Sequence, residues 1–379
     1  MSIKVRLGDY IKEYSVRNKA EEDIPVYSVT NTQGFCRDYF GKEVASKDKS
    51  TYKIVPRGYF AYNPSRINVG SVDWQRYEDR VIVSPLYNVF SVAPQLDQQY
   101  LYYYLKSDYV IQRIRAVAIG SVRDNLKLTM LYEFPIYIPC LDQQKGVVNR
   151  LDRVKRIIEL REQELQTLDD LIKARFVEMF GNDTNPYNWP VVNVEEVANV
   201  SVGVVIKPAQ YYTDARHGVK AFRSLNIGPM TIKDGDWVYF SFEGNEKNAK
   251  SQLKENDLLI VRSGAPGTAC VVSKQYEGCN AIDIIIARPN TEQIDPHYLC
   301  TYTNMPHGKR QIEEGTGGAA QQHFNVGKYN KLRLMLPPMS LQKEFVDFIV
   351  QIDKSKVVVQ KALAETQLLF DSLMQEYFG

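Results

Sequence analysis

Residues 143–180 read QQKGVVNRLDRVKRIIELREQELQTLDDLIKARFVEMF. This stretch has no proline, and its apolar residues recur in alternating steps of four and three. A 4-3 spacing that continues over about four to five heptads is typical of a coiled-coil seam. We therefore expect one helix over the whole stretch, roughly 57 Å long at ~1.5 Å per residue.

The end of the chain repeats this pattern in the same register. A shift of 198 positions (from 180 to 378) places Phe180-Gly181 on Phe378-Gly379 and Gln144-Lys145 on Gln342-Lys343. The shift predicts a second long helix like the first. The predicted seam of the two helices consists of Val147, Leu151, Val154, Ile158, Leu165, Leu168, Ile172, Phe345, Ile349, Ile352, Val359, Leu363, Phe370 and Leu373.

Two long helices with matching stripes are expected to pack against each other in antiparallel orientation. Polar residues interrupt the seam at Arg161 and Arg175 in the first helix, and at Lys356 and Thr366 in the second. These positions differ between the helices, so each polar residue is expected to face a mostly apolar position, which favours pairing of unlike helices. The alternative is that each stripe packs separately into the core of its own domain.

Weaker matches lie upstream of each long helix. The same shift places Asp97 on Asp295, whereas further upstream only a loose likeness remains, for example between RGYFAYN (57–63) and NDLLIVR (256–262). The ends of the two halves are therefore alike and their interiors differ. A duplicated scaffold that carries two divergent inserts explains this pattern.

Between the repeated parts the chain reads as mixed α/β structure. Runs rich in β-branched and aromatic residues at 81–92, 258–264 and 281–289 are expected to form strands bounded by turns. The turn-rich segment 181–190 marks the boundary between the halves. The predicted class is α+β, with two mixed α/β domains joined by the two antiparallel helices in a pseudo-twofold repeat. The predicted domains are residues 1–140 and 182–338, and the predicted long helices are 141–181 and 339–379.

The motifs of common catalytic and metal-binding classes are missing from the sequence. Its five cysteines form no C-x-x-C pair, so neither a disulfide framework nor a zinc site is expected. No Gly-Lys pair is followed by Ser or Thr, as a phosphate-binding loop requires. The Asn/Asp-Pro-Pro-aromatic motif of adenine methyltransferases is missing as well. We therefore expect no catalytic site, no metal and no cofactor in this chain.

The charge and hydropathy of the chain restrict its partners and location. The net charge of +2 is small for a nucleic-acid-binding protein, so local patches or a partner must attract the phosphates if DNA is the ligand. No stretch reaches the ~20 apolar residues of a membrane span, and the N-terminus MSIKVRLGDY lacks the apolar core of a signal peptide. We expect a cytoplasmic protein that binds no membrane.

Two segments, one before each long helix, carry a family resemblance. They read GSVRDNLKLTMLYEFPIYIPCLDQQKGVV (120–148) and GTGGAAQQHFNVGKYNKLRLMLPPMSLQKEFV (315–346). Each runs from a glycine-hydroxyl pair through a strand that ends in proline to a Gln-Lys pair, and a heptad helix closing on Phe-Gly follows. In this order and repetition the chain resembles the conserved regions of type I restriction-modification specificity subunits. The second half departs from the first in having His323-Phe324 where the first has Asn125-Leu126.

The resemblance implies a non-catalytic subunit that binds DNA through two target-recognition domains. Each domain would read one half of a split double-stranded target, and the paired helices would set the distance between the half-sites. The implied partners are two methyltransferase subunits and, for cleavage, two restriction/translocase subunits. Their holoenzyme would be an adenine-N6 DNA methyltransferase and an ATP-dependent type I site-specific deoxyribonuclease. S-adenosylmethionine, ATP and Mg²⁺ would bind those partners and not this chain.

The candidate DNA contacts are polar residues in loops near the predicted strands, because Arg and Lys read guanine whereas Asn and Gln read adenine. In the first domain they are Ser28, Thr30, Asn31, Asn63, Arg66 and Asn68, with Arg123 and Lys127 as phosphate contacts. In the second domain they are Arg223, Ser224, Asn226, Asn245, Lys247, Arg262 and Ser263. For each of them the alternative is a solvated surface position or a turn.

Two other functions stay open at the level of the sequence. The same architecture would serve a modification-only or phase-variable DNA methyltransferase, and a neighbouring gene for a helicase-nuclease distinguishes that case. The long helices would also suit a coiled-coil interaction scaffold that has no DNA role. Salt-sensitive binding of duplex DNA, once the methyltransferase partner is added, excludes the scaffold.

Overall fold

The computed structural model of the chain describes residues 4–37, 49–118, 125–182, 184–316 and 324–379. The chain forms two compact units. Unit 1 combines Met1–Gln163 with Gln360–Gly379, and unit 2 is Glu164–Val359. The beginning and the end of the chain therefore belong to the same unit, where the Lys4 ammonium donates a hydrogen bond to the carbonyl oxygen of Gly379 (3.3 Å).

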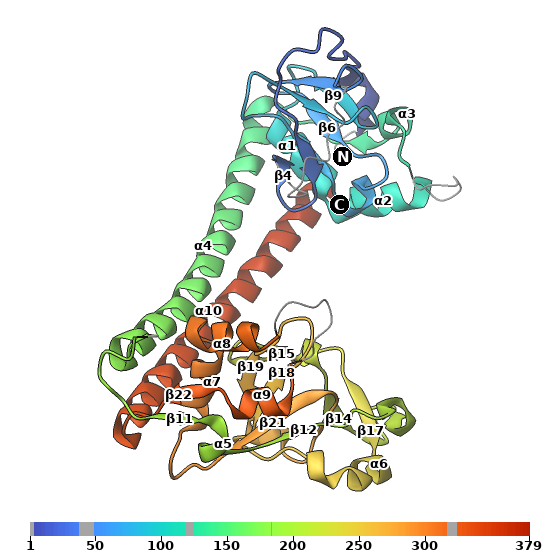
Figure 1. Ribbon diagram of the computed structural model, residues 1–379. Helices are drawn as coiled ribbons and strands as arrows, with labels where there is room; N and C mark the ends of the chain where they lie inside the picture. The colour runs from blue at the N-terminus through green and yellow to red at the C-terminus, as the bar shows by residue number, and fades with distance from the viewer. Residues whose placement is uncertain (1–3, 38–48, 119–124, 183, 317–323) are drawn as a thin grey trace. The chain divides into compact units, whose positions relative to one another are not determined.

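Unit 1 is built around a four-stranded antiparallel sheet (Figure 1). Its strand order is β2 (Ile11–Glu13), β9 (Asn88–Val92), β6 (Phe60–Tyr62) and β7 (Val72–Trp74). Three two-stranded pairs accompany the sheet: β1 (Val5–Arg6) with β10 (Pro135–Ile136), β3 (Ser28–Thr30) with β4 (Gly34–Cys36), and β5 (Lys53–Pro56) with β8 (Arg80–Val83). The shorter helices are α1 (Gln98–Lys106), α2 (Asp108–Ala118) and α3 (Leu128–Tyr132).

Aromatic residues of the central strands form the middle of the unit 1 core. Phe60 on β6 stacks on Phe90 of β9 with ring centroids 5.1 Å apart, and both rings are fully buried. The segment 81–92 contains most of β8 and all of β9, which a turn at Ser84–Tyr87 separates. Proline at the second position of such a turn fixes the backbone that reverses the chain.

Unit 2 contains a corresponding central sheet and a second one. The central sheet has the order β12 (Ala198–Val202), β21 (Ile284–Pro289), β18 (Leu258–Val261) and β19 (Ala269–Val271). The second sheet has the order β13 (Tyr212–Thr213), β17 (Val238–Ser241), β14 (Gly218–Phe222) and β20 (Asn280–Ala281). Two pairs complete the strands: β11 (Val191–Asn193) with β22 (Arg333–Met335), and β15 (Ile227–Gly228) with β16 (Thr231–Ile232). The shorter helices are α5 (Val194–Val197), α6 (Phe242–Lys247), α7 (Pro296–Asn304), α8 (Pro306–Thr316) and α9 (Val326–Asn330).

The central sheets of the two units share one topology. By position in the chain, both have the strand order first, fourth, second, third, and every neighbouring pair is antiparallel. The loosely similar segments 57–63 and 256–262 contain β6 and β18, which hold the same place in the two sheets. The weak likeness in sequence therefore marks equivalent strands. The units differ beyond this sheet, since unit 2 adds the sheet formed by β13, β17, β14 and β20.

Two helices of 40 residues each, α4 (Leu141–Phe180) and α10 (Met339–Phe378), contribute to both units. In unit 1, Leu151 near the start of α4 shares a buried cluster with Met374 and Phe378 near the end of α10. In unit 2, Phe176 near the end of α4 shares a cluster with Phe345 near the start of α10. The predicted antiparallel packing of the helices is confirmed. All predicted seam residues lie in the described part of the chain, and each is buried or half-buried.

The polar residues in the seam are arranged differently from the prediction. The Arg161 guanidinium donates hydrogen bonds to the Thr366 hydroxyl and to the carbonyl oxygen of Ala362, so two of the polar interruptions meet each other. Antiparallel packing does not place repeat-equivalent positions opposite each other, and the expectation of apolar partners was wrong for this reason. Lys356 instead forms an ion pair with Asp169 (2.5 Å).

Candidate nucleic-acid interface

The loop between β6 and β7 gathers four of the candidate residues in unit 1. Asn63 closes a turn, because its side-chain oxygen accepts hydrogen bonds from the backbone N–H (3.1 Å) and hydroxyl (2.9 Å) of Ser65. The exposed Arg66 follows, and Asn68 lies two residues further on. The backbone N–H of Leu126 donates to the carbonyl oxygen of Pro64 (3.1 Å), which places the exposed Lys127 beside the same loop.

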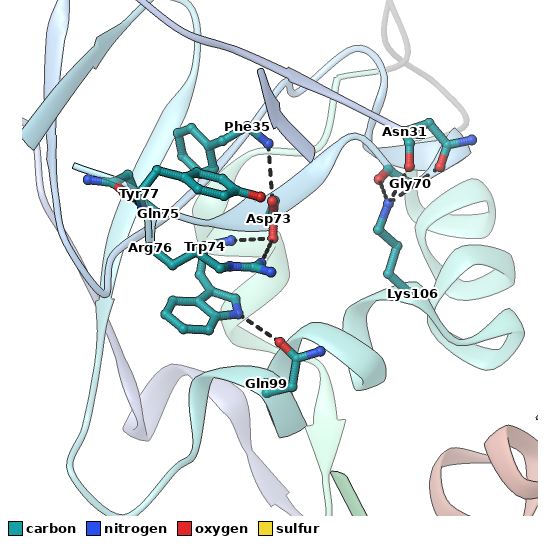
Figure 2. A network of polar contacts seen from close by, with 10 residues as sticks. All are labelled: Asn31, Phe35, Gly70, Asp73, Trp74, Gln75, Arg76, Tyr77, Gln99 and Lys106. Atoms are coloured by element: carbon teal, nitrogen blue, oxygen red, sulfur yellow. Dashed lines mark hydrogen bonds and ion pairs between the residues drawn. The ribbon is translucent and has the colours of Figure 1, made fainter. Parts of the chain in front are cut away.

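Lys106 joins this loop to the β3–β4 hairpin (Figure 2). Its ammonium donates hydrogen bonds to the carbonyl oxygen of Asn31 (3.0 Å) and to that of Gly70. Burial lowers the pKa of Lys106 to about 8, and the nearby Asp73 carboxylate opposes that shift. Lys106 at the end of α1 therefore holds Asn31, which is exposed, next to the loop that carries Asn63, Arg66 and Asn68.

Asp73 on β7 anchors the β3–β4 hairpin to the central sheet. Its carboxylate accepts hydrogen bonds from the backbone N–H of Phe35 (3.1 Å) and of Trp74 (2.8 Å), and it forms an ion pair with Arg76. Burial raises the pKa of Asp73, while the positive charge of Arg76 opposes that shift. Gly34 in the hairpin turn has φ +62°, and a Cβ there would lie 2.0 Å from an Asp73 carboxylate oxygen. Only glycine therefore allows this close approach.

We expect Asp73→Ala to loosen the hairpin. The change leaves the Phe35 N–H without its acceptor in a buried site, at a cost of about 1–3 kcal/mol in the free energy of unfolding. Hydrogen exchange at the Phe35 amide, together with urea unfolding, measures the effect. The control is Asp79→Ala, because Asp79 is fully exposed and its ion pair with Arg57 (3.3 Å) is solvated. Unchanged exchange at Phe35 contradicts the anchoring role.

The other two hairpin candidates, Ser28 and Thr30, lie on β3. Ser28 is half-buried, whereas Thr30 is buried and its hydroxyl accepts a hydrogen bond from the backbone N–H of Gln33 (3.0 Å). Thr30 therefore shapes the hairpin turn. Arg123 lies outside the described residues.

In unit 2 the structure shows that several candidates have internal roles. Asn226 is fully buried, accepts a hydrogen bond from the backbone N–H of Arg223 (2.9 Å) and donates one to the carbonyl oxygen of Gly235 (2.7 Å). The Arg223 guanidinium donates to the carbonyl oxygen of Asp236, so these two residues close one loop. Ser224 between them is half-buried.

Asn245 and Arg262 are also bound inside unit 2. Asn245 is buried, and its amide donates to the carbonyl oxygen of Gly278 (3.1 Å) and accepts from the Asn280 amide (2.9 Å). The mostly buried Arg262 guanidinium donates to the carbonyl oxygen of Phe324 (3.1 Å) and pairs with Asp283. These bonds give Asn245 and Arg262 roles inside unit 2, as the bonds of Asn226 do.

Two further unit 2 candidates keep contact with solvent. Lys247 on α6 is exposed and forms an ion pair with Glu243 one turn earlier (2.6 Å). Ser263, half-buried, follows the end of β18. The second unit therefore presents fewer of the predicted polar groups than the first.

Sequence reasoning missed three side chains at the unit 1 loop. Lys106 was hidden in a helix, where a terminal lysine is ordinary. Arg115 on α2 donates from its guanidinium to the carbonyl oxygen of Asn68 (3.3 Å). Burial raises the pKa of the Tyr87 hydroxyl, while the nearby Val29 backbone and Asn63 side chain oppose that shift, which places Tyr87 beside the loop. Only tertiary packing brings these residues to the loop, so no local pattern signalled them.

The described residues contain no group of three or more His, Cys, Asp or Glu side chains arranged to hold a metal ion. None of the helices in the described part of the chain combines the length and the apolar character needed to cross a membrane.

Comparisons with known proteins identify the same architecture. The profile of the type I restriction modification DNA specificity domain matches residues 4–170. The chain is 20% identical over 406 residues to the specificity subunit of the type I restriction enzyme StySPI from Salmonella potsdam, which covers 99% of this chain and 86% of that protein.

Two solved structures have a similar fold. One is a chain from a study of complex assembly and conformational transition of the type I R-M system, with a TM-score of 0.59, 18% identity and coverage of 99% of this chain and 97% of that one. The other is the S subunit of the type I restriction-modification system from M. genitalium, with a TM-score of 0.52, 13% identity and coverage of 99% and 96%.

The profile match, the relative that aligns along the whole chain and the shared fold agree with the duplicated sheets and the antiparallel helices. The first part of the chain matches the DNA specificity domain of type I restriction-modification systems, and along its whole length the chain is similar to a specificity subunit of such a system.

Proposed function

We propose that this chain is a specificity subunit, the non-catalytic member of its enzyme, and that it recognises a split double-stranded DNA target. Each unit reads one half-site, and the paired helices set the gap between the half-sites. The observation that carries the proposal is the repetition of one sheet topology with unlike loops, each copy attached to the same antiparallel helix pair. In this assignment residues 1–140 and 182–338 are the target-recognition domains, and 141–181 and 339–379 are the spacer helices.

At the first half-site the proposed contacts come from one edge of the unit 1 sheet. Asn31, Asn63 and Asn68 offer amides that suit adenine, and Arg66 offers the guanidinium that suits guanine. Lys127 contacts phosphate, and Lys106 and Arg115 hold the loop in place. Arg123, as predicted from the sequence, is a further phosphate contact.

At the second half-site the proposed contacts are fewer. Arg223, Ser224, Lys247 and Ser263 remain, while the buried Asn226 and Asn245 and the half-buried Arg262 shape the loops that carry them. These four residues carry cationic and hydroxyl groups, which commonly contact phosphates. We therefore expect unit 2 to depend more on contacts with the DNA backbone and on DNA shape than unit 1 does.

The chemistry of methylation and cleavage belongs to partner subunits in this proposal. Two methyltransferase subunits bind S-adenosylmethionine, and two restriction/translocase subunits bind ATP and Mg²⁺. The support is the similar chain described in a complex assembly of a type I R-M system. This chain positions those subunits on the DNA.

Lengthening both helices by one heptad is expected to widen the recognised gap. Arg161 meets Ala362 and Asp169 meets Lys356, so insertions after Gln163 and after Lys361 lie opposite each other. Seven residues add ~10 Å of helix, and the gap should grow by about three base pairs at 3.4 Å each. Mapping methylated adenines in a host that carries the operon, against a library of gap lengths, measures the change.

The control for this experiment replaces seven residues after each of the two positions with the inserted sequences, so the length stays native. An unchanged gap in the lengthened variant defeats the spacer role. A changed half-site sequence defeats the assignment of reading to the two units.

A further inference from the structure

Two aliphatic side chains stand out from the surface of the protein. Among the large apolar residues that the structure describes, Ile206 and Leu86 are the most exposed, at 80% and 78%. A single exposed apolar residue is ordinary on a soluble protein. Here each unit contributes one, and both extend from loops next to the central sheet.

The two residues occupy the same edge of equivalent sheets. Leu86 lies two residues before the start of β9, and Ile206 lies four residues after the end of β12. The end of β12 pairs with the start of β21, where Val202 lies opposite Ile285. β9 and β21 hold the same place in the strand order of their sheets. Leu86 and Ile206 therefore lie at the equivalent end of the central sheet in unit 1 and in unit 2.

Both loops are held in shape by their own hydrogen bonds. In the Leu86 turn, the backbone N–H of Tyr87 donates to the carbonyl oxygen of Ser84 (3.0 Å), and the Lys53 ammonium donates to the carbonyl oxygen of Tyr87 (2.7 Å). Pro85 restricts the backbone before Leu86. These restraints hold the turn in the conformation that exposes Leu86.

The Ile206 loop is restrained in a similar way. The backbone N–H of Val204 donates to the carbonyl oxygen of Ala281 (2.8 Å). Lys207 adopts a left-handed conformation, with φ 45°, and Pro208 follows it. Each aliphatic side chain is thus adjacent to, or one residue from, a proline.

The surroundings of Leu86 indicate what it meets. Asn88 at the start of β9 lies opposite Tyr62, the last residue of β6 before the loop that begins at Asn63. Burial raises the pKa of the neighbouring Tyr87 hydroxyl, while the nearby Asn63 side chain and the charge of Arg66 oppose that shift. Leu86 therefore projects from the edge that carries the proposed base-reading loop. Ile206 is followed by the cationic Lys207, which suits phosphate. An apolar tip among amide and cationic groups fits duplex DNA, whose stacked base pairs are apolar and whose borders are anionic.

We propose that Leu86 and Ile206 each insert between two base pairs of their half-site and unstack that step. This inference rests on the proposed function, since it requires each unit to bind one half-site. Leucine and isoleucine are among the residues that proteins use as such wedges, and unstacking makes the DNA bend at that step. The apolar area that each tip exposes in the free protein is then buried by bases.

The experiment uses the chain with its methyltransferase partner and duplexes in which 2-aminopurine replaces one adenine at a time. The wild-type complex should raise the fluorescence at one step in each half-site. Leu86→Ser should abolish the signal in the first half-site alone, and Ile206→Ser in the second alone. Each serine variant should bind about tenfold to a hundredfold more weakly, as the loss of a buried leucine predicts. Leu86→Met should restore the signal.

Leu160→Ser is the matched control, because Leu160 is a half-exposed leucine of unit 1 that lies on α4 and not on the central sheet. It should change neither signal. If the wild-type complex binds the split target but Leu86→Ser keeps the fluorescence change, the wedge is wrong and the proposed function stands. If replacing thymine by uracil removes as much affinity as Leu86→Ser does, the side chain touches a methyl group at the base edge and does not insert. If the wild-type complex fails to bind the split target, the proposed function itself fails.

Discussion

Gln144→Leu is expected to destabilise unit 1 by about 3 kcal/mol or more, because three buried polar groups lose their partner at roughly 1–3 kcal/mol each. The Gln144 side chain is fully buried near the start of α4. Its amide oxygen accepts a hydrogen bond from the backbone N–H of Asp97 (2.8 Å). Its amide nitrogen donates to the carbonyl oxygens of Gln95 (2.8 Å) and Pro139 (2.7 Å). Leucine fills a similar volume and satisfies none of these groups.

The same arrangement occurs in unit 2, which allows a second test in the same chain. Gln342 is fully buried, accepts from the backbone N–H of Asp295 (2.8 Å), and donates to the carbonyl oxygens of Pro337 (2.8 Å) and Gln293 (3.5 Å). Gln342→Leu should therefore destabilise unit 2. The longer third hydrogen bond predicts a smaller effect than that of Gln144→Leu.

Tryptophan fluorescence separates the two effects during urea unfolding. Trp74 reports on unit 1, and Trp189 and Trp237 report on unit 2. Lys145→Leu and Lys343→Leu are the controls, since both lysines are exposed neighbours of the glutamines. If the controls cost as much as the glutamine variants, the buried hydrogen bonds are not the cause.

Gln144 and Gln342 show what the repeat in the sequence can and cannot predict. The shift of 198 positions (from 144 to 342) identified them as equivalent, because duplication preserves what the scaffold needs. It did not reveal their role, since each amide bonds to backbone groups that only the folded chain brings near. The heptad spacing was more informative, because a side-chain period alone determines which face of a helix is buried.

The sequence did not predict the register of the helix pair, that is, which residues of α4 and α10 lie opposite each other. Each predicted seam residue is buried or half-buried, whereas the contact between Arg161 and Thr366 was not predicted. Opposite positions on antiparallel helices depend on where each helix is anchored in its unit. That anchoring comes from long-range contacts such as the one between Phe180 and Tyr298.

The candidate DNA contacts show the limit of choosing residues by type. Asn226 and Asn245 were selected because asparagine reads adenine, but a short amide in a turn also bonds readily to its own backbone. Burial decides whether such an asparagine reads a base or bonds to its own backbone, and the sequence of a polar loop does not predict burial. Leu86 and Ile206 were missed for the opposite reason, because apolar residues beside strand-like runs are expected in the core.

Phe180→Ala is expected to destabilise unit 2 by about 3–5 kcal/mol, the usual cost of removing a buried aromatic ring from a core. Phe180 ends α4 and is fully buried. Its ring lies 4.9 Å from that of Tyr298 on α7 and 5.4 Å from that of Phe345 on α10, measured between centroids. Val177→Ala is the control, because Val177 lies one turn earlier on an exposed face of the same helix.

The equivalent change in the second half is expected to act on the other unit. Phe378 ends α10, and its ring centroid lies 5.1 Å from that of Tyr100 on α1 in unit 1. Each half of the duplicated chain therefore closes with a helix whose last aromatic ring enters the core of the opposite unit. Phe378→Ala should lower the midpoint that Trp74 reports, and Phe180→Ala the midpoint that Trp189 and Trp237 report.

This exchange of helix ends distinguishes two ways in which a duplicated chain can fold. If each half folded on its own, a change in the first half would weaken the unit made of the first half. The arrangement described here predicts the reverse for Phe180, which belongs to the first half and stabilises the second unit. A loss of stability reported by Trp74 after Phe180→Ala would contradict it. Because each unit borrows the end of the other half's helix, neither half should fold fully when it is expressed without its partner.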